Sequence, residues 1–110
     1  MDTGRRFAAL VDAFDGTPGV TLPGEPGGRG FGSGALKVDG SIFAMAVQGA
    51  VVLKLPEARV AELVGSGAGS PFDSGKGRPM REWVALDGDD SDADLQLARE
   101  ALAHVRSRRR

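Results

Sequence analysis

Residues 35–55 decide the fold, and they read ALKVDGSIFAMAVQGAVVLKL. Two runs of strand-forming residues flank Asp39-Gly40, a dipeptide that favours the type I′ turn of a two-residue β-hairpin. A second turn is expected at Gln48-Gly49, because strand-forming residues follow it again. The segment therefore predicts three consecutive strands at the centre of an antiparallel sheet.

Pairing through these turns predicts which side chains share a face of the sheet. It places Leu36 opposite Phe43 and Met45 opposite Val52. Those four residues share one face of the sheet. On the other face we expect five apolar residues, Ile42, Ala44, Val51, Leu53 and Leu55. Because both faces are apolar, helices on one side only would leave the other face uncovered. We expect the glycine-rich segment before these strands, or a second copy of the protein, to cover it.

Amphipathic helical patterns precede and follow the strands. Their apolar positions recur at spacings of three and four residues. These positions are Phe7, Leu10, Val11 and Phe14, then Val60, Leu63 and Val64, and finally Leu95, Ala98, Ala101, Leu102 and Val105. Pro56 suits the first turn of the second helix, and residues 91–94 have the Ser-x-x-acid form of a capping box that starts the third. A further strand is expected at 80–86.

The predicted order is helix, three strands, helix, one or two strands, helix. Because strands and helices do not alternate, this order favours an α+β two-layer domain, an antiparallel sheet with helices, over a doubly wound sheet. The chain has 110 residues, which suits a single domain spanning 1–110. Residues 16–30 are rich in Gly and Pro and are expected to form a flexible loop, and residues 107–110 form a basic tail.

The composition narrows the classes of function. With no Cys, the chain has no disulfide framework, thiolate zinc site or Cys nucleophile. Its net charge of −1 gives no overall field that recruits nucleic acid or an anionic membrane. No stretch approaches the roughly 18 apolar residues of a membrane span, and the N-terminus lacks the apolar run of a signal peptide. These features predict a cytoplasmic protein that makes no membrane contact.

The candidate catalytic and cofactor patterns are incomplete. The glycines of 28–34 are followed by a strand, whereas a dinucleotide fingerprint needs a helix there. Gly75-Lys76-Gly77 lacks the Ser or Thr that follows the lysine of a P-loop. His104, the sole histidine, is placed on the solvent side of the last helix, about 180° from Leu95. We therefore expect no catalytic, metal or cofactor-binding residues, and a protein that is not an enzyme.

Two sets of residues remain as candidate contact sites. The candidate anion or nucleic-acid contacts are Lys76, Arg78, Arg81, Arg106, Arg108 and Arg109. The candidate interaction surface comprises Phe43, Met45, Val52 and Trp83. The second set suits a protein partner or self-association as a homodimer, and the first suits nucleic acid. A third hypothesis is a ligand-binding or enzymatic site between the sheet and the glycine-rich loops, which a deep pocket with convergent carboxylates would favour.

Three segments of the chain together resemble the TfoX N-terminal-domain and YjbR-like family. They are GALKVDGSIFAMAV (34–47), VLKLP (52–56) and PFDSGKGRPMREWV (71–84), and the similarity spans about residues 5–105. The resemblance implies a small α+β fold with the order α-β-β-β-α-β-β-α. The two apolar sheet faces and the incomplete catalytic patterns favour a non-enzymatic regulatory or protein-interaction module that resembles the TfoX N-terminal domain. The alternative that the resemblance implies is a small DNA-binding or transcription-associated protein, which would use the basic 76–81 loop and the C-terminal arginines. The resemblance supplies no catalytic residues.

Overall fold

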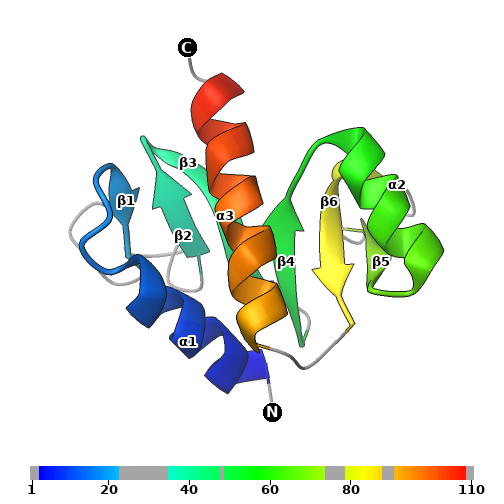
Figure 1. Cartoon of the computed structure of the whole chain (residues 1–110), viewed down its shortest axis with the longest axis horizontal. Helices are drawn as coiled ribbons and strands as arrows, with labels where there is room; N and C mark the ends of the chain where they lie inside the picture. The colour runs from blue at the N-terminus through cyan, green and yellow to red at the C-terminus, as the bar shows by residue number, and fades with distance from the viewer. Residues whose placement is uncertain (1–2, 23–34, 48, 74–78, 88–90, 109–110) are drawn as a thin grey trace.

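The chain folds into three helices and a six-stranded antiparallel sheet in the computed structural model, which describes residues 3–22, 35–47, 49–73, 79–87 and 91–108 (Figure 1). In chain order the elements are α1 (Thr3–Phe14), β1 (Val20–Thr21), β2 (Ala35–Val38), β3 (Ser41–Val47), β4 (Ala50–Lys54), α2 (Glu57–Ser66), β5 (Gly69–Asp73), β6 (Pro79–Leu86) and α3 (Ser91–Arg108). The strand order across the sheet is β1-β2-β3-β4-β6-β5. The predicted α+β class and order of elements are confirmed.

The structure adds one short strand to the predicted order. β1 lies within the segment 16–30, which was expected to be a loop, and it pairs antiparallel with β2. The residues of this segment from 23 onward lie outside the part that the structure describes.

The turns of the central hairpins lie where the sequence predicts them. Asp39 and Gly40 have φ angles of 52° and 88°, the two positive values that a type I′ turn requires. Val47 pairs with Ala50, so two residues connect β3 to β4, and Gly49 in this turn has a φ of 75°. The turn residues and the strand-forming runs beside them therefore located the centre of the sheet.

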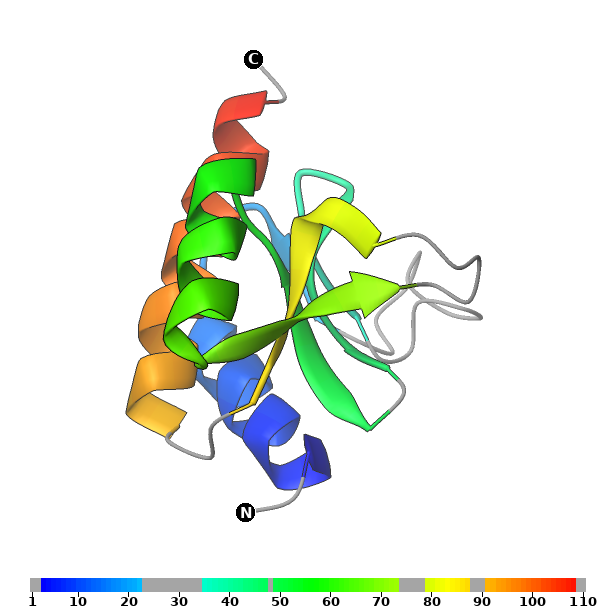
Figure 2. The same ribbon diagram turned by 90° about the vertical axis from the view of Figure 1, so that its right-hand side faces the viewer.

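All three helices lie on one face of the sheet (Figure 2). α3 packs over β2, β3 and β4 with α1 beside it, whereas α2 packs over β5 and β6. The layer between helices and sheet is filled with apolar side chains, and Phe14 of α1 meets Phe43 of β3 edge to face, with ring centroids 5.3 Å apart. In the described part of the chain, no helix has both the length and the apolar character that crossing a membrane requires.

A β-bulge in β3 alters the predicted faces of the sheet. Leu36 pairs with Ala44, and Lys37 pairs with Ile42, so Phe43 is the extra residue between the two pairs. The predicted pairing of Leu36 with Phe43 is therefore wrong. The bulge brings Phe43 and Ala44, which are neighbours in sequence, into the same helix-side core together with Leu36.

The face of the sheet away from the helices carries Met45, Val52 and Trp83. Met45 pairs with Val52, as predicted. Val52 has no exposed surface although it lies outside the helix-side core, whereas Met45 and Trp83 are partly exposed. Trp83 pairs with Lys54, whose Nζ lies 5.5 Å from the ring centroid, a cation–π contact. The glycine-rich segment was expected to cover this face unless a second copy does, and its residues from 23 to 34 lie outside the described residues.

Gly69, the first residue of β5, allows a close approach to β6. A Cβ atom at this position would lie 2.6 Å from Val84 Cγ2 and 3.1 Å from the carbonyl oxygen of Ala85. We expect Gly69→Ala to lower the free energy of unfolding by about 1–3 kcal/mol, the usual cost of overpacking. Urea unfolding of the purified variant measures this loss.

The matched control is Gly65→Ala in α2, where no atom lies within 4 Å of the added Cβ. This variant should be neutral or more stable by up to about 1 kcal/mol, because alanine favours the helix. An unchanged urea midpoint for Gly69→Ala would contradict the packing that the structure gives to β5.

Candidate functional site

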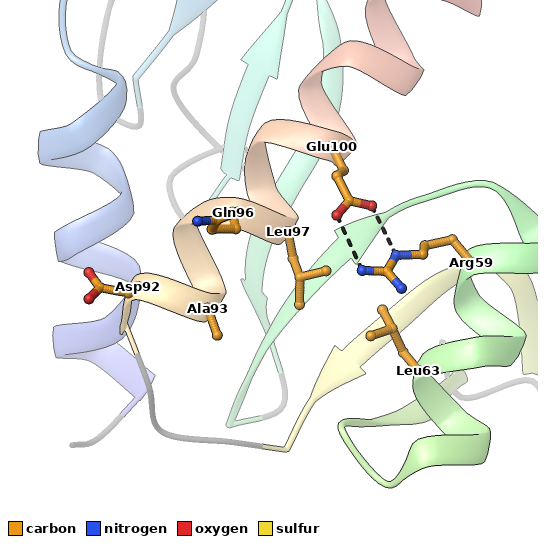
Figure 3. Close-up of a pocket in the computed structure, with 7 residues that line it drawn as sticks. All are labelled: Arg59, Leu63, Asp92, Ala93, Gln96, Leu97 and Glu100. Carbon is orange, nitrogen blue, oxygen red and sulfur yellow. Dashed lines mark hydrogen bonds and ion pairs between the residues drawn. The ribbon is translucent and has the colours of Figure 1, made fainter.

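An open groove lies between α2 and α3 on the helix-covered side of the molecule (Figure 3). α2 packs on β5 and β6 while α3 packs on β2, β3 and β4, so the two helices stand apart above the sheet. The groove has a volume of about 400 Å³ and is lined by Arg59, Leu63, Asp92, Ala93, Gln96, Leu97 and Glu100.

A smaller hollow of about 170 Å³ adjoins the groove where α2 ends. It shares Ala93 and Leu97 with the groove, and its other lining residues are Gly67, Ala68, Leu86, Asp87 and Asp94. α2 stops here because Gly67 has a φ of 86°, a left-handed conformation in which its N–H caps the carbonyls of Leu63 and Val64. The two hollows form one continuous surface along the first turns of α3.

The groove has an apolar floor and a charged rim. The side chains of Leu63 and Leu97 point toward each other from the two helices, and Leu63 is buried while Leu97 is half-buried. Ala93 leaves the space beside Leu97 open, because its methyl group is too small to fill it. A partner's apolar side chain that entered here would remove these groups from water, which is favourable at about 25 cal/mol per Å² of apolar surface.

Arg59 bridges the two helices at one end of the groove. Its Nε and Nη2 donate to the two carboxylate oxygens of Glu100 at 2.9 and 3.2 Å (Figure 3). Its Nη1 donates to Glu62 at 3.3 Å. The hydrogen bond to Glu100 raises the pKa of Arg59, and desolvation opposes the rise. The guanidinium thus stays charged into more alkaline solution than a free arginine, and the bidentate pair links α2 to α3.

Asp94, at the inner side of the adjoining hollow, forms a buried ion pair with Arg6 of α1. Nε and Nη2 of Arg6 each donate to one carboxylate oxygen of Asp94 at 2.9 Å. The two residues are 6% and 3% exposed, so the pair ties α1 to the first turn of α3 inside the protein. The sequence indicated only a capping role for Asp94, because its partner lies 88 residues away.

His104 does not lie on the solvent side of α3, and that prediction was wrong. Its Nε2 lies 3.0 Å from Oε1 of Glu82 on β6, and its side chain is only 13% exposed. The buried face of α3 is centred on Ala98, Ala101 and Val105, about a quarter turn from Leu95. His104 lies about a quarter turn to the other side of this centre and therefore reaches the sheet.

The described cations of the predicted anion site lie on different elements, and each already contacts oxygen atoms of the protein. Arg81 on β6 is 82% exposed and lies 3.7 Å from Glu57. Arg106 of α3 lies 3.4 Å from Asp39 and donates to the carbonyl of Pro18, so it holds the β2–β3 turn. Arg108 is the last residue of α3, and Lys76, Arg78 and Arg109 are outside the described residues.

The structure divides the predicted interaction surface. Phe43 lies in the core against Phe14 because of the bulge, and Val52 is buried on the opposite face. Met45 and Trp83 are half-buried on that opposite face. Two of the four residues are thus inaccessible, whereas the groove between α2 and α3 has apolar side chains at an open surface.

Within the described ranges, no three His, Asp or Glu side chains are grouped so that they could hold a metal ion. Comparison of the chain with protein-family models, with curated proteins and with solved structures gives no match.

Proposed function

We propose that this chain is a non-enzymatic protein-interaction module that resembles the TfoX N-terminal domain, and that it binds a helical segment of a partner protein in the α2–α3 groove. The observation that carries the proposal is the groove itself, with Leu63 and Leu97 as its floor and Arg59, Asp92 and Glu100 as its rim. An amphipathic helix binds such a groove through its apolar face, while the rim contacts its polar edges.

The side chains around the groove support binding rather than catalysis. None of the seven lining residues is a Ser, Thr, Cys, Lys or His that could act as nucleophile or base. Asp92 and Glu100 are eight residues apart on α3, roughly 12 Å along the helix axis, whereas the two catalytic carboxyl groups of glycoside hydrolases are about 5–9.5 Å apart. Glu100 is also engaged by Arg59.

Site-specific photo-crosslinking in the cells that naturally make the protein tests the proposal. A photoactivatable amino acid replaces Gln96, which lines the groove, or Ala103, an exposed residue of α3 outside the groove. We expect a discrete protein adduct from position 96 and none from position 103. The blocking substitution Ala93→Arg, at an exposed helical position, should abolish that adduct without unfolding the protein.

Equal labelling from both positions, or an adduct that Ala93→Arg does not reduce, would overturn the proposal. The DNA-binding alternative gives a different pattern. In an anisotropy titration with a labelled duplex, it predicts affinity that falls steeply with added salt and that is indifferent to Ala93→Arg. Salt-sensitive DNA binding that Ala93→Arg does not change, together with no adduct from position 96, would favour the DNA-binding hypothesis over the interaction module.

A further inference from the structure

We infer that the α2–α3 groove selects a cationic amphipathic helix, a segment with aliphatic side chains on one face and lysine or arginine along the edges of that face. The inference rests on the proposed function and adds the chemistry of the partner. It follows from the charge around the groove and from the shape of its floor.

The exposed charges around the groove are mostly carboxylates. Asp92 and Glu100 line the groove, Asp87 lines the adjoining hollow, and Glu62 stands beside the rim with 67% of its side chain exposed. Arg59 is the one cation among the residues that line these two hollows, and Glu100 and Glu62 already contact it. A second arginine, the exposed Arg99, lines a third hollow beside the groove together with Asp92 and Glu100, so four carboxylates stand against two arginines. A helix that enters the groove therefore faces a negative rim.

The floor of the groove suits two successive anchors of one helix. The larger and smaller hollows, of about 400 and 170 Å³, adjoin at Ala93 and Leu97. An amphipathic helix presents apolar side chains at i and i+3 or i+4, which lie beside each other on one face. One such side chain can occupy each hollow while the residues that flank this face lie over the rim.

Charge on the partner's edges then decides which helices bind. Lysines at these edges approach exposed carboxylates, whereas glutamates there meet like charges at the same positions. Because the rim is exposed to water, this contrast acts on specificity and association rate more than on maximal affinity. We expect about a tenfold or greater preference for cationic edges, which corresponds to about 1.4 kcal/mol.

Three synthetic helical peptides test the inference. Each carries leucines at i, i+3, i+4 and i+7, and the flanking positions are lysine, glutamine or glutamate. Each peptide is titrated into the ¹⁵N-labelled full chain and followed by NMR. The lysine peptide should bind most tightly and shift the amide signals of Leu63, Ala93 and Leu97, and the glutamate peptide should bind about tenfold more weakly or worse.

Charge variants of the protein locate the effect. Glu62→Lys combined with Asp92→Asn should weaken lysine-peptide binding about tenfold, whereas Asp12→Lys combined with Asp15→Asn changes the net charge equally and should have less than about a twofold effect. Asp12 and Asp15 are exposed at the end of α1, on the other side of α3 from α2. All variants are first compared with the parent by circular dichroism and thermal unfolding.

The possible results separate the inference from the proposed function. Equal binding of the three peptides, with shifts confined to the groove, would overturn the cationic preference and leave the helix-binding groove standing. Binding of no peptide, or shifts on the opposite face at Met45 and Trp83, would overturn both. A lysine preference that the Asp12 and Asp15 control reduces as much as the groove variant would reveal a general charge effect and overturn the inference.

Discussion

Asp94→Ala should lower the free energy of unfolding by about 3–5 kcal/mol, because it breaks a buried ion pair from one side. The substitution removes the carboxylate that accepts two hydrogen bonds from Arg6, while the guanidinium remains in a site where the residue is 6% exposed. The pair also joins α1 to the start of α3, so its loss loosens two helices. Urea unfolding monitored by circular dichroism gives the change.

Two further variants separate this effect from a general effect of charge at the start of α3. Asp92→Ala removes an exposed carboxylate from the same helical turn and should cost about 0.3–1 kcal/mol, the contribution of an acid near a helix N-terminus. Arg6→Met combined with Asp94→Leu replaces both charges by apolar groups and should recover most of the stability. Similar losses for Asp94→Ala and Asp92→Ala would exclude the pair as the tie between the helices.

The fold was largely predictable because its signals are local. A type I′ turn needs two residues with positive φ, and Asp39-Gly40 meets that need within two positions. The apolar residues at spacings of three and four predicted α1, α2 and α3 in the same way, because this pattern repeats within each helix. The β-bulge was not predictable, because Phe43 and Ala44 are both apolar and no polar residue marks the break in alternation.

The candidate site was not predictable from these local patterns, because it forms between elements distant in the chain. Arg59 and Glu100 are 41 residues apart, and no sequence pattern within either helix predicts that they pair. One signal was present: Leu97 is an apolar residue of α3 that lies outside the predicted stripe. An apolar side chain off the buried stripe indicates a second contact face, and here it contributes to the groove floor.

Phe43→Ala should cost about 3–5 kcal/mol of unfolding free energy, which sets Phe43 apart from the surface residues with which the sequence grouped it. The side chain has no exposed surface, and truncating a buried phenylalanine leaves a cavity. The edge-to-face contact with Phe14 adds to the loss, since such pairs contribute about 0.5–1.5 kcal/mol beyond the burial of their area. Chemical denaturation measures the change.

Met45→Ala, two residues along β3, is the matched comparison for Phe43→Ala. Met45 is half-buried on the face away from the helices, so its truncation removes less area from a packed environment and should cost about 1–2 kcal/mol. If Phe43 instead belonged to an interaction surface, Phe43→Ala would leave the unfolding free energy close to that of the parent and alter association with a partner or a second copy. Equal losses for the two variants would contradict the bulge, because a regular β3 places Phe43 and Met45 on the same face.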